Sequence, residues 1–441
     1  MRVGRRTQLQ RGVPTAQRQF RTDHMHAVAR PGRGPDPLRA PHPRRRLHRD
    51  RERLREVGRA TACAPVSTSR STERDPLTAV ATPKVPPVRL ARAVERLRHV
   101  LDRAHQRSAP PSAVMLEKIL GAWISQGITV AADLRVADAL ADGPLPIGEL
   151  ARRVGANPDA LARLMRALIG EGVFTQRRDG RYALNALGRT LCTDATMSVA
   201  GMARMIGHPA HREHWSQLLD AIRTGEATVP KLRGMPGFEY LSENRELGEI
   251  FNDAMTNLSE TAVAPLTAAY DFRGFGTIVD VGGGHGRFLS AILAATPSAR
   301  GVLYDLPQVV EGATELLGSH GVADRVEIVG GSFFDSIPAG ADAYVAKNVI
   351  HDWPDADALT ILRNIRSAAG TGATLLLAEF VIPDHHRAFI GNWTDMEMLM
   401  ATAARERTEA EYRKLYQQAG FRLTRVVPTV APISLIEGKA V

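Results

Sequence analysis

The sequence predicts an α/β fold in which a Rossmann-like parallel sheet follows a helical, winged-helix-like domain. Two patterns predict it. Residues 271–441 alternate short apolar runs with amphipathic helical stretches, as in a parallel sheet covered by helices on both faces. Residues 113–270 are dominated by helical spacing. The expected strands are Thr277–Val281, Gly301–Asp305, Val326–Val329, Ala343–Ala346 and Thr374–Ala378, with a closing hairpin of Phe421–Val427 and Ile433–Glu437.

The first 112 residues differ in composition from the rest of the chain. They hold 26 Lys and Arg against 9 Asp and Glu, and 13 of the 27 prolines, but one aromatic residue, Phe20. Such a segment buries too little apolar surface to offset the entropy of ordering it, so we expect a disordered extension. A misplaced translation start is the alternative interpretation. Apolar spacing predicts one short helix over 88–107.

Charge and cysteine content narrow the choice of partners. The formal net charge of +10 would favour nucleic acid, but residues 113–441 alone carry a net charge of −7. We therefore expect no nucleic-acid partner. No apolar run approaches the roughly 18 residues of a transmembrane helix, so no membrane partner is expected. The two cysteines, Cys63 and Cys192, exclude a disulfide framework and fit a cytoplasmic protein.

Residues 145–184 have the helix, turn, helix and hairpin order of a winged helix. The second helix would carry Leu161, Leu164, Met165 and Leu168 on one face, and Asp179-Gly180 marks the hairpin turn. Such a unit can bind DNA, with Arg163 on the recognition helix. We favour packing or dimerisation instead, because a nucleotide-type fold follows it.

Three histidines, His208, His211 and His214, recur at helical spacing ahead of Trp215. Glu213 is the only acid nearby and its offset is poor, so a metal site is disfavoured and no metal is expected. A polar patch beside a substrate cleft, or packing between helices, accounts for the histidines better.

A glycine-rich turn follows the first strand of the α/β domain. Gly282, Gly284 and Gly286 let the backbone approach a ligand, but the spacing fails the dinucleotide fingerprint, which disfavours NAD and FAD. Asp280 suits a ligand with an amino group. Asp305 ends the second strand, where a carboxylate can accept hydrogen bonds from ribose hydroxyls. Together these features predict an adenosyl cofactor.

Seven motifs extend this pattern through the rest of the chain: VDVGGGHGRF, YDLPQVV, GGSFFDSIP, KNVIHDWPD, LAEFVIP, DMEML and RERTEAEYRKLYQQAGF. In this order they resemble the caffeate-type O-methyltransferases of plants and bacteria, and among these the bacterial natural-product enzymes. The resemblance covers about residues 113–441. It implies the class I methyltransferase fold, S-adenosylmethionine as methyl donor, a phenolic or polyketide-type substrate, and a homodimer built by the N-terminal domain.

The resemblance also assigns cofactor contacts. It implies that Gly282, Gly283 and Gly284 contact the methionine part, that Asp305 binds the ribose and that Leu306 packs near the adenine. The other cofactor residues that it implies are Ser332, where many members have Asp, together with Phe333, Lys347 and Trp353.

His351 matches the family's general base, and the chemistry supports the match. A phenol has a pKa of about 10, so it is mostly protonated at neutral pH and needs a base as it attacks the methyl carbon. A neutral imidazole can accept that proton. Glu379 and Glu406 match acids that flank and orient the histidine, although Ala403 and Ala404 stand where the family has glycines.

The substrate wall is assigned to Met255 and Met398, since flexible apolar groups suit an aromatic ligand, and to Asn252, which lies with Met255 on one expected helix. Two other functions stay open. Some relatives of this fold hydroxylate or decarboxylate with the same cofactor, but they tend to lose the histidine. A DNA-binding regulator would use the winged helix and the basic extension.

A chain that begins at residue 113 retains every motif of the resemblance. We expect it to fold, dimerise and transfer methyl groups, because the extension before it lies outside the family pattern. Circular dichroism, sedimentation and a methyl-transfer assay test this expectation. An unfolded product would show that the boundary at residue 112 is misplaced.

Overall fold

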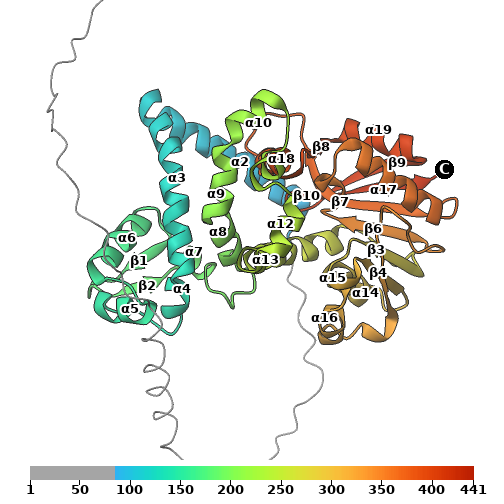
Figure 1. The fold of residues 1–441 in the computed structure, drawn as a ribbon. Helices are drawn as coiled ribbons and strands as arrows, with labels where there is room; N and C mark the ends of the chain where they lie inside the picture. The colour runs from blue at the N-terminus through green and yellow to red at the C-terminus, as the bar shows by residue number, and fades with distance from the viewer. Residues whose placement is uncertain (1–84) are drawn as a thin grey trace, which may run out of the picture. The chain divides into compact units, whose positions relative to one another are not determined.

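The structure, a computed structural model, describes residues 85–441. Of the extension over residues 1–112 for which we expect disorder, residues 1–84 lie outside this range. The first part is helical with one small hairpin (Figure 1). Its elements are α2 (Val88–Arg107), α3 (Pro111–Asp133), α4 (Val136–Ala139), α5 (Ile147–Val154), α6 (Pro158–Gly170), β1 (Phe174–Gln176), β2 (Tyr182–Leu184), α7 (Ala186–Arg189), α8 (Ala200–Gly207), α9 (Pro209–Ser216), α10 (Leu218–Thr224), α11 (Thr228–Arg233), α12 (Gly237–Glu243) and α13 (Arg245–Ala269).

The winged-helix pattern is confirmed in α5, α6 and the β1–β2 hairpin. Asn157 begins α6, because its side chain accepts hydrogen bonds from the amides of Asp159 and Ala160. The helix then buries Leu161, Met165 and Leu168 on one face. The predicted helix over 88–107 is present as α2, although none of its residues is buried. Within residues 85–441, no helix has the length and apolar character to cross a membrane.

The second part of the chain folds around one mixed sheet in the order β5-β4-β3-β6-β7-β10-β9. Strands β3 to β7 are parallel, and β10 enters antiparallel between β7 and β9, so the predicted closing hairpin is confirmed. The two-residue β8, which was not predicted, pairs with the end of β7. The strands are β3 (Thr277–Val281), β4 (Arg300–Asp305), β5 (Val326–Gly330), β6 (Ala343–Lys347), β7 (Thr374–Ile382), β8 (Arg407–Thr408), β9 (Phe421–Pro428) and β10 (Ile433–Ala440).

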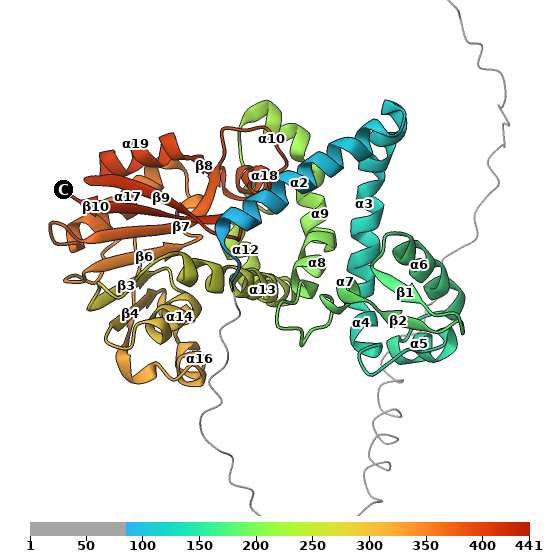
Figure 2. The ribbon, with the colours of Figure 1, turned by 180° about the vertical axis from the view of Figure 1, so that it is seen from behind.

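Helices cover both faces of this sheet, as Figures 1 and 2 show. One core packs α17 and α19 on the sheet through residues such as Ile361 and Tyr416. The other packs α13, α14 and α16 on the opposite face through residues such as Leu266 and Leu289. The remaining elements are α14 (Arg287–Ala295), α15 (Pro307–Val310), α16 (Ala313–Ser319), η1 (Ala323–Arg325), η2 (Ile350–Asp352), α17 (Asp355–Ala368), α18 (Gly391–Thr402) and α19 (Glu409–Ala419).

This arrangement determines where a site can form. The carboxyl ends of β3, β4, β6 and β7 lie at one edge of the sheet, because these strands are parallel neighbours. The glycine turn follows β3, Asp305 ends β4, and the His351 segment follows β6. Helix α13 carries two of the predicted substrate residues and packs against α14, which follows the glycine turn.

Candidate active site

The glycine turn between β3 and α14 has the open backbone that a close ligand requires. Gly282 and Gly284 have φ angles of 66° and 58°, a region that side chains disfavour. A Cβ at Gly283 would lie 2.8 Å from the Asp280 carboxylate, whereas nothing lies within 4 Å of one at Gly284. The turn is therefore closed on its sheet side and open on its outer side at Gly284.

Asp305 lies directly beside this turn. One oxygen of its carboxylate accepts from the Gly284 amide at 2.8 Å, and the other accepts from the Leu306 amide at 2.7 Å. Each oxygen keeps a second lone pair for a ligand hydroxyl. The next side chain, Leu306, is exposed. A ribose with a neighbouring adenine fits this pair of residues.

Aromatic rings form the next part of the same edge. The Phe333 ring lies 5.9 Å from that of Trp353, and Phe334 lies between them in sequence and in packing. A Cβ at Gly282 would lie 3.6 Å from Phe333, so these rings adjoin the glycine turn. Ser332 accepts from the Phe334 amide. The structure thus brings the sequence-predicted adenine contacts together with the turn.

Asp280 is buried behind the turn, and the charge that opposes it comes from the half-buried Lys347. One oxygen of Asp280 has no hydrogen-bond partner among the described residues, and burial raises the pKa of this carboxyl to about 7 against the opposing charge of Lys347. Burial in turn lowers the pKa of the Lys347 amine, against the pull of Asp280. This unpartnered carboxylate oxygen could accept from the amino group of a ligand, and the contact stays a prediction.

His351 lies in the short turn η2 after β6, and its side chain is buried. Its Nδ1 donates to Oε1 of Glu406 at 2.8 Å. A carboxylate can only accept, so when the ring is neutral its proton lies on Nδ1 and Nε2 is the free nitrogen. Nε2 lies 3.5 Å from the carboxylate of Asp352, a residue that the sequence analysis did not single out.

Glu379 acts on the histidine by another route than the sequence predicted. Its carboxylate accepts from the backbone amides of Val349 and Ile350, at 3.1 and 2.9 Å, rather than from the imidazole. It still lies close, since ligand atoms of His351, Glu379 and Glu406 are all within 4.8 Å of one another. Glu379 therefore orients the histidine through the backbone that carries it.

The surrounding charges determine the protonation of this cluster. Burial alone would lower the pKa of His351, but the carboxylates of Asp352, Glu379 and Glu406 together raise it above the usual 6.5. Burial raises the pKa of Asp352 to about 6, opposed by the imidazolium, and also raises the pKa of Glu406. The ring is therefore a stronger base than an ordinary histidine.

Arg407, which the sequence analysis missed, fixes the backbone around His351. Its side chain is fully buried and follows Glu406 directly. The guanidinium donates to the carbonyls of Ile350 and Trp353, at 3.0 and 2.9 Å, on either side of the histidine. It also donates to Asp355 through Nε and Nη2, at 3.0 and 2.8 Å. One planar group thus holds both ends of the turn that carries His351.

The predicted substrate residues lie on two helices: Asn252 and Met255 are about one turn apart on α13, and Met398 is on α18. Met255 packs in a small cluster with Met205 and Ile250 on α13 and α8. Asn252 is exposed on α13, and Met398 is half-buried on α18. Their role in substrate binding therefore stays a prediction.

The histidines before Trp215 take part in contacts between helices. His211 Nε2 lies 3.1 Å from Glu397 of α18, and Trp215 Nε1 donates to the same carboxylate at 2.7 Å. His214 accepts from Arg233 of α11 at 3.0 Å. The acid that pairs with His211 is 186 residues away in the chain, so no local pattern could reveal it.

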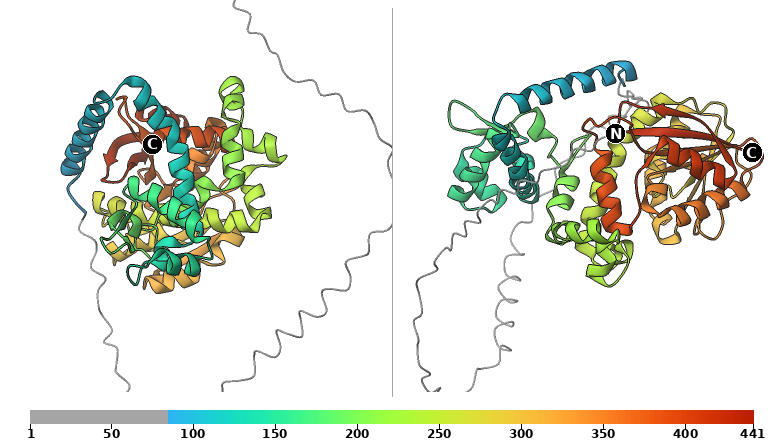
Figure 3. Two further views of the ribbon diagram at one scale, coloured as in Figure 1. Left: turned by 90° about the vertical axis from the view of Figure 1, so that its left-hand side faces the viewer. Right: turned by 90° about the horizontal axis from the view of Figure 1, so that it is seen from above.

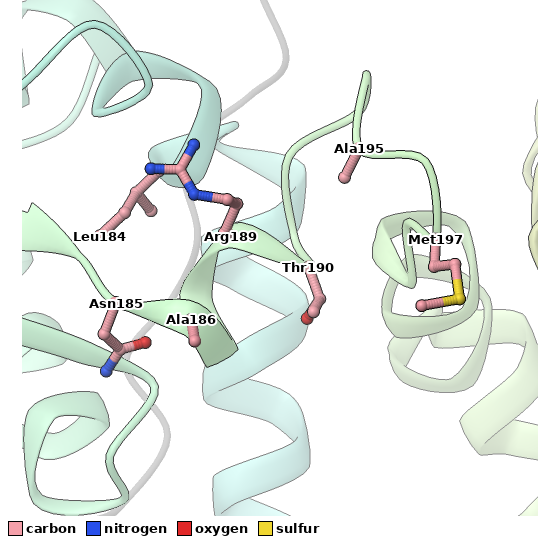
Figure 4. A pocket seen from close by; sticks show the side chains of 7 residues that line it. All are labelled: Leu184, Asn185, Ala186, Arg189, Thr190, Ala195 and Met197. Carbon is pink, nitrogen blue, oxygen red and sulfur yellow. The ribbon is translucent and has the colours of Figure 1, made fainter. Parts of the chain in front are cut away.

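A separate open groove lies near the winged helix, apart from the His351 cluster (Figure 4). Leu184 and Met197 give it an apolar lining, and Arg189 lies on its rim. Its full lining is Leu184, Asn185, Ala186, Arg189, Thr190, Ala195 and Met197.

Known families match both parts of the chain. The profile of an O-methyltransferase domain matches residues 215–422, and that of an O-methyltransferase dimerisation domain matches residues 116–194, which include the winged helix.

Individual relatives match over nearly their whole length. The phenazine O-methyltransferase PhzM of Lysobacter antibioticus is 38% identical over 334 residues, which are 76% of this chain and 98% of that protein. The mitomycin biosynthesis 6-O-methyltransferase of Streptomyces lavendulae is 40% identical, over 72% of this chain and 91% of that protein. The solved structure of NcsB1, an O-methyltransferase from neocarzinostatin biosynthesis in complex with S-adenosylmethionine and 2-hydroxy-5-methyl naphthoic acid, superposes with a TM-score of 0.62 at 35% identity. The match covers 72% of this chain and 96% of that one.

Replacing Arg407 with Lys tests the clamp on the catalytic turn. Lysine keeps the charge but lacks the planar fork, so it cannot hold Ile350, Trp353 and Asp355 at once. We expect kcat to fall by about tenfold or more, while the affinity for the methyl donor stays within about twofold. Arg413→Lys, at an exposed ion pair with Glu409, is the matched control. Equal kcat in the Arg407 and Arg413 variants would contradict the clamp.

Proposed function

The chain belongs to the S-adenosylmethionine-dependent O-methyltransferases, and we propose that it methylates a hydroxyl group of an aromatic small molecule of secondary metabolism, with His351 as general base. The observation that carries this proposal is the buried hydrogen bond from His351 to Glu406. It fixes the tautomer whose Nε2 can accept the hydroxyl proton.

The raised pKa of His351 suits a phenolic substrate. An ordinary imidazole is weaker than a phenolate by about 3.5 pKa units, so proton transfer between them is uphill. The three carboxylates around His351 reduce that difference by stabilising the imidazolium. Glu406 holds the ring, Glu379 holds its backbone, and Arg407 prevents the turn from shifting.

The methyl donor supplies an activated methyl group when it is bound. We propose that Gly282, Gly283 and Gly284 lie against its methionine part, with Asp280 and Lys347 behind them. Asp305 is assigned to the ribose hydroxyls; one of its oxygens accepts from the Gly284 amide of this turn and the other from the Leu306 amide. The adenine is assigned to a slot formed by Leu306, Ser332, Phe333 and Trp353.

The acceptor is proposed to be a flat, hydroxylated ring system. The names of the relatives refer to a phenazine and to mitomycin, and NcsB1 holds a naphthoic acid. We assign its wall to Asn252, Met255 and Met398, on helices from the two parts of the chain. The hydroxylase or decarboxylase alternative is disfavoured because His351 is present, and the dimerisation profile over the winged helix disfavours the DNA-binding regulator.

The proposal includes a homodimer and a cytoplasmic location. Met115, Leu116, Ile119 and Trp123 form one exposed apolar row on α3, and three of the four lie in the dimerisation profile. Trp123 is 74% exposed, which is unusual for a tryptophan in a monomer. A second copy of the chain would cover this row. The low cysteine content supports the cytoplasm.

Replacing His351 with Ala tests the general base. We expect methylation of a panel of phenols to fall by about 10²-fold or more, because alanine has no nitrogen in place of Nε2 to accept the hydroxyl proton. Calorimetry with S-adenosylmethionine should show donor binding retained. His320→Ala, at an exposed histidine of the same domain, is the control. Full activity in the His351 variant would refute the assignment.

The pH profile of Glu406→Gln tests the source of the basicity. The base must be unprotonated, so kcat/KM falls as pH drops below the pKa of His351. Removing the Glu406 charge takes away one group that raises this pKa. The acidic limb of the profile should therefore move to lower pH, with a lower plateau because the ring is held less well. A limb that does not move would show that another group titrates.

A further inference from the structure

Helix α2 has an apolar row that no part of the described chain covers. Leu90, Val94, Leu97 and Leu101 are each between 48% and 59% exposed. Their spacing of four, three and four residues is that of a helix seam that packs against a partner. Four large apolar side chains along one helix form a larger exposed patch than a monomer usually presents.

The row points away from the rest of the molecule. At about 100° per residue, it lies on the side of α2 opposite to Val88, His99 and Gln106, which are three of the four half-buried positions of this helix. Figures 2 and 3 show α2 (blue) joined to α3 at one end. There His105 Nε2 lies 3.4 Å from Glu117 of α3. The face that meets the body and the apolar face are therefore different faces.

A second copy of the chain is the partner that the surrounding surface favours. Leu116, Ile119 and Trp123 of α3, the helix joined to α2, are also exposed, and they lie in the dimerisation profile, which begins at residue 116. Charge agrees. Helix α2 carries six arginines against two acids, whereas residues 113–441 carry a net charge of −7. Two α2 helices would repel each other, so the acidic body of the second copy is the better match.

We propose that α2 is an additional arm of the dimer interface, which packs Leu90, Val94, Leu97 and Leu101 on the body of a second copy of this chain. The inference rests on the homodimer proposed above and extends it to a helix that precedes the dimerisation profile. Because both copies present the same row, a symmetric dimer would contain this contact twice, once from each subunit.

The test replaces Leu97 and Leu101 with Glu in the full chain. Glutamate is a good helix former, so α2 is retained while its row becomes charged. Sedimentation at nanomolar to micromolar concentration measures the dimer dissociation constant. We expect it to rise by about 100-fold. The matched control is Leu219→Glu with Ile222→Glu on α10, which are 61% and 59% exposed. The control should leave the dissociation constant within about twofold.

Three results would overturn the inference. One is an unchanged dissociation constant in the α2 variant. It would mean that residues 1–84 or another protein, and not a second copy, cover the row. The others are an equal rise in the α10 control and a wild-type chain that stays monomeric. Trp123→Glu separates this inference from the homodimer itself. If Trp123→Glu dissociates the dimer and the α2 variant does not, the proposed homodimer is supported and the proposed role of α2 in it is refuted. Methyl transfer, measured in parallel, tests the catalytic assignment independently.

Discussion

The buried guanidinium of Arg407 is the constraint on which the rest of the site depends. A charged group in the interior is stable only when its donors are satisfied, and Arg407 finds its acceptors in the turn that carries the histidine. The same strand residue pairs with Val381 at the end of β7, and Glu406 precedes it. The contacts of this one side chain therefore fix the positions of Glu406, His351 and the end of β7 relative to one another.

Electrostatics and backbone strain are both concentrated around this point. Three carboxylates crowd one imidazole, and one oxygen each of Glu379 and Glu406 has no partner among the described residues. Ala403, where the family has glycine, adopts a φ of 57°, which costs a side-chain-bearing residue about 1 kcal/mol. Glu406 nevertheless reaches His351, because the Asp395 carboxylate accepts from its amide at 2.9 Å. The tertiary frame thus compensates for a locally unfavourable residue.

The sequence allowed most of the regular structure to be predicted, and less of the site. The bounds of β3 and the residues of the α6 core follow from local apolar spacing. The two residues of β8 carry no such signal, because their conformation depends on pairing with β7. Arg407 and Glu397 were missed for a related reason: their partners are dozens to nearly two hundred residues away. The motif around His351 could be recognised, but the bonds of Glu379 to the backbone amides depend on how the chain folds in three dimensions.

The link between α9 and α18 has a consequence for how the enzyme can move. Glu397 binds both His211 and Trp215, and the pKa of His211 is raised because the carboxylate more than offsets the effect of burial. Separating the two helices would leave a charge buried without its partner, at a cost of several kcal/mol. The contact therefore opposes any motion that separates α9 from α18. An opening of the molecule that exchanges ligands costs less free energy where it leaves this buried pair intact.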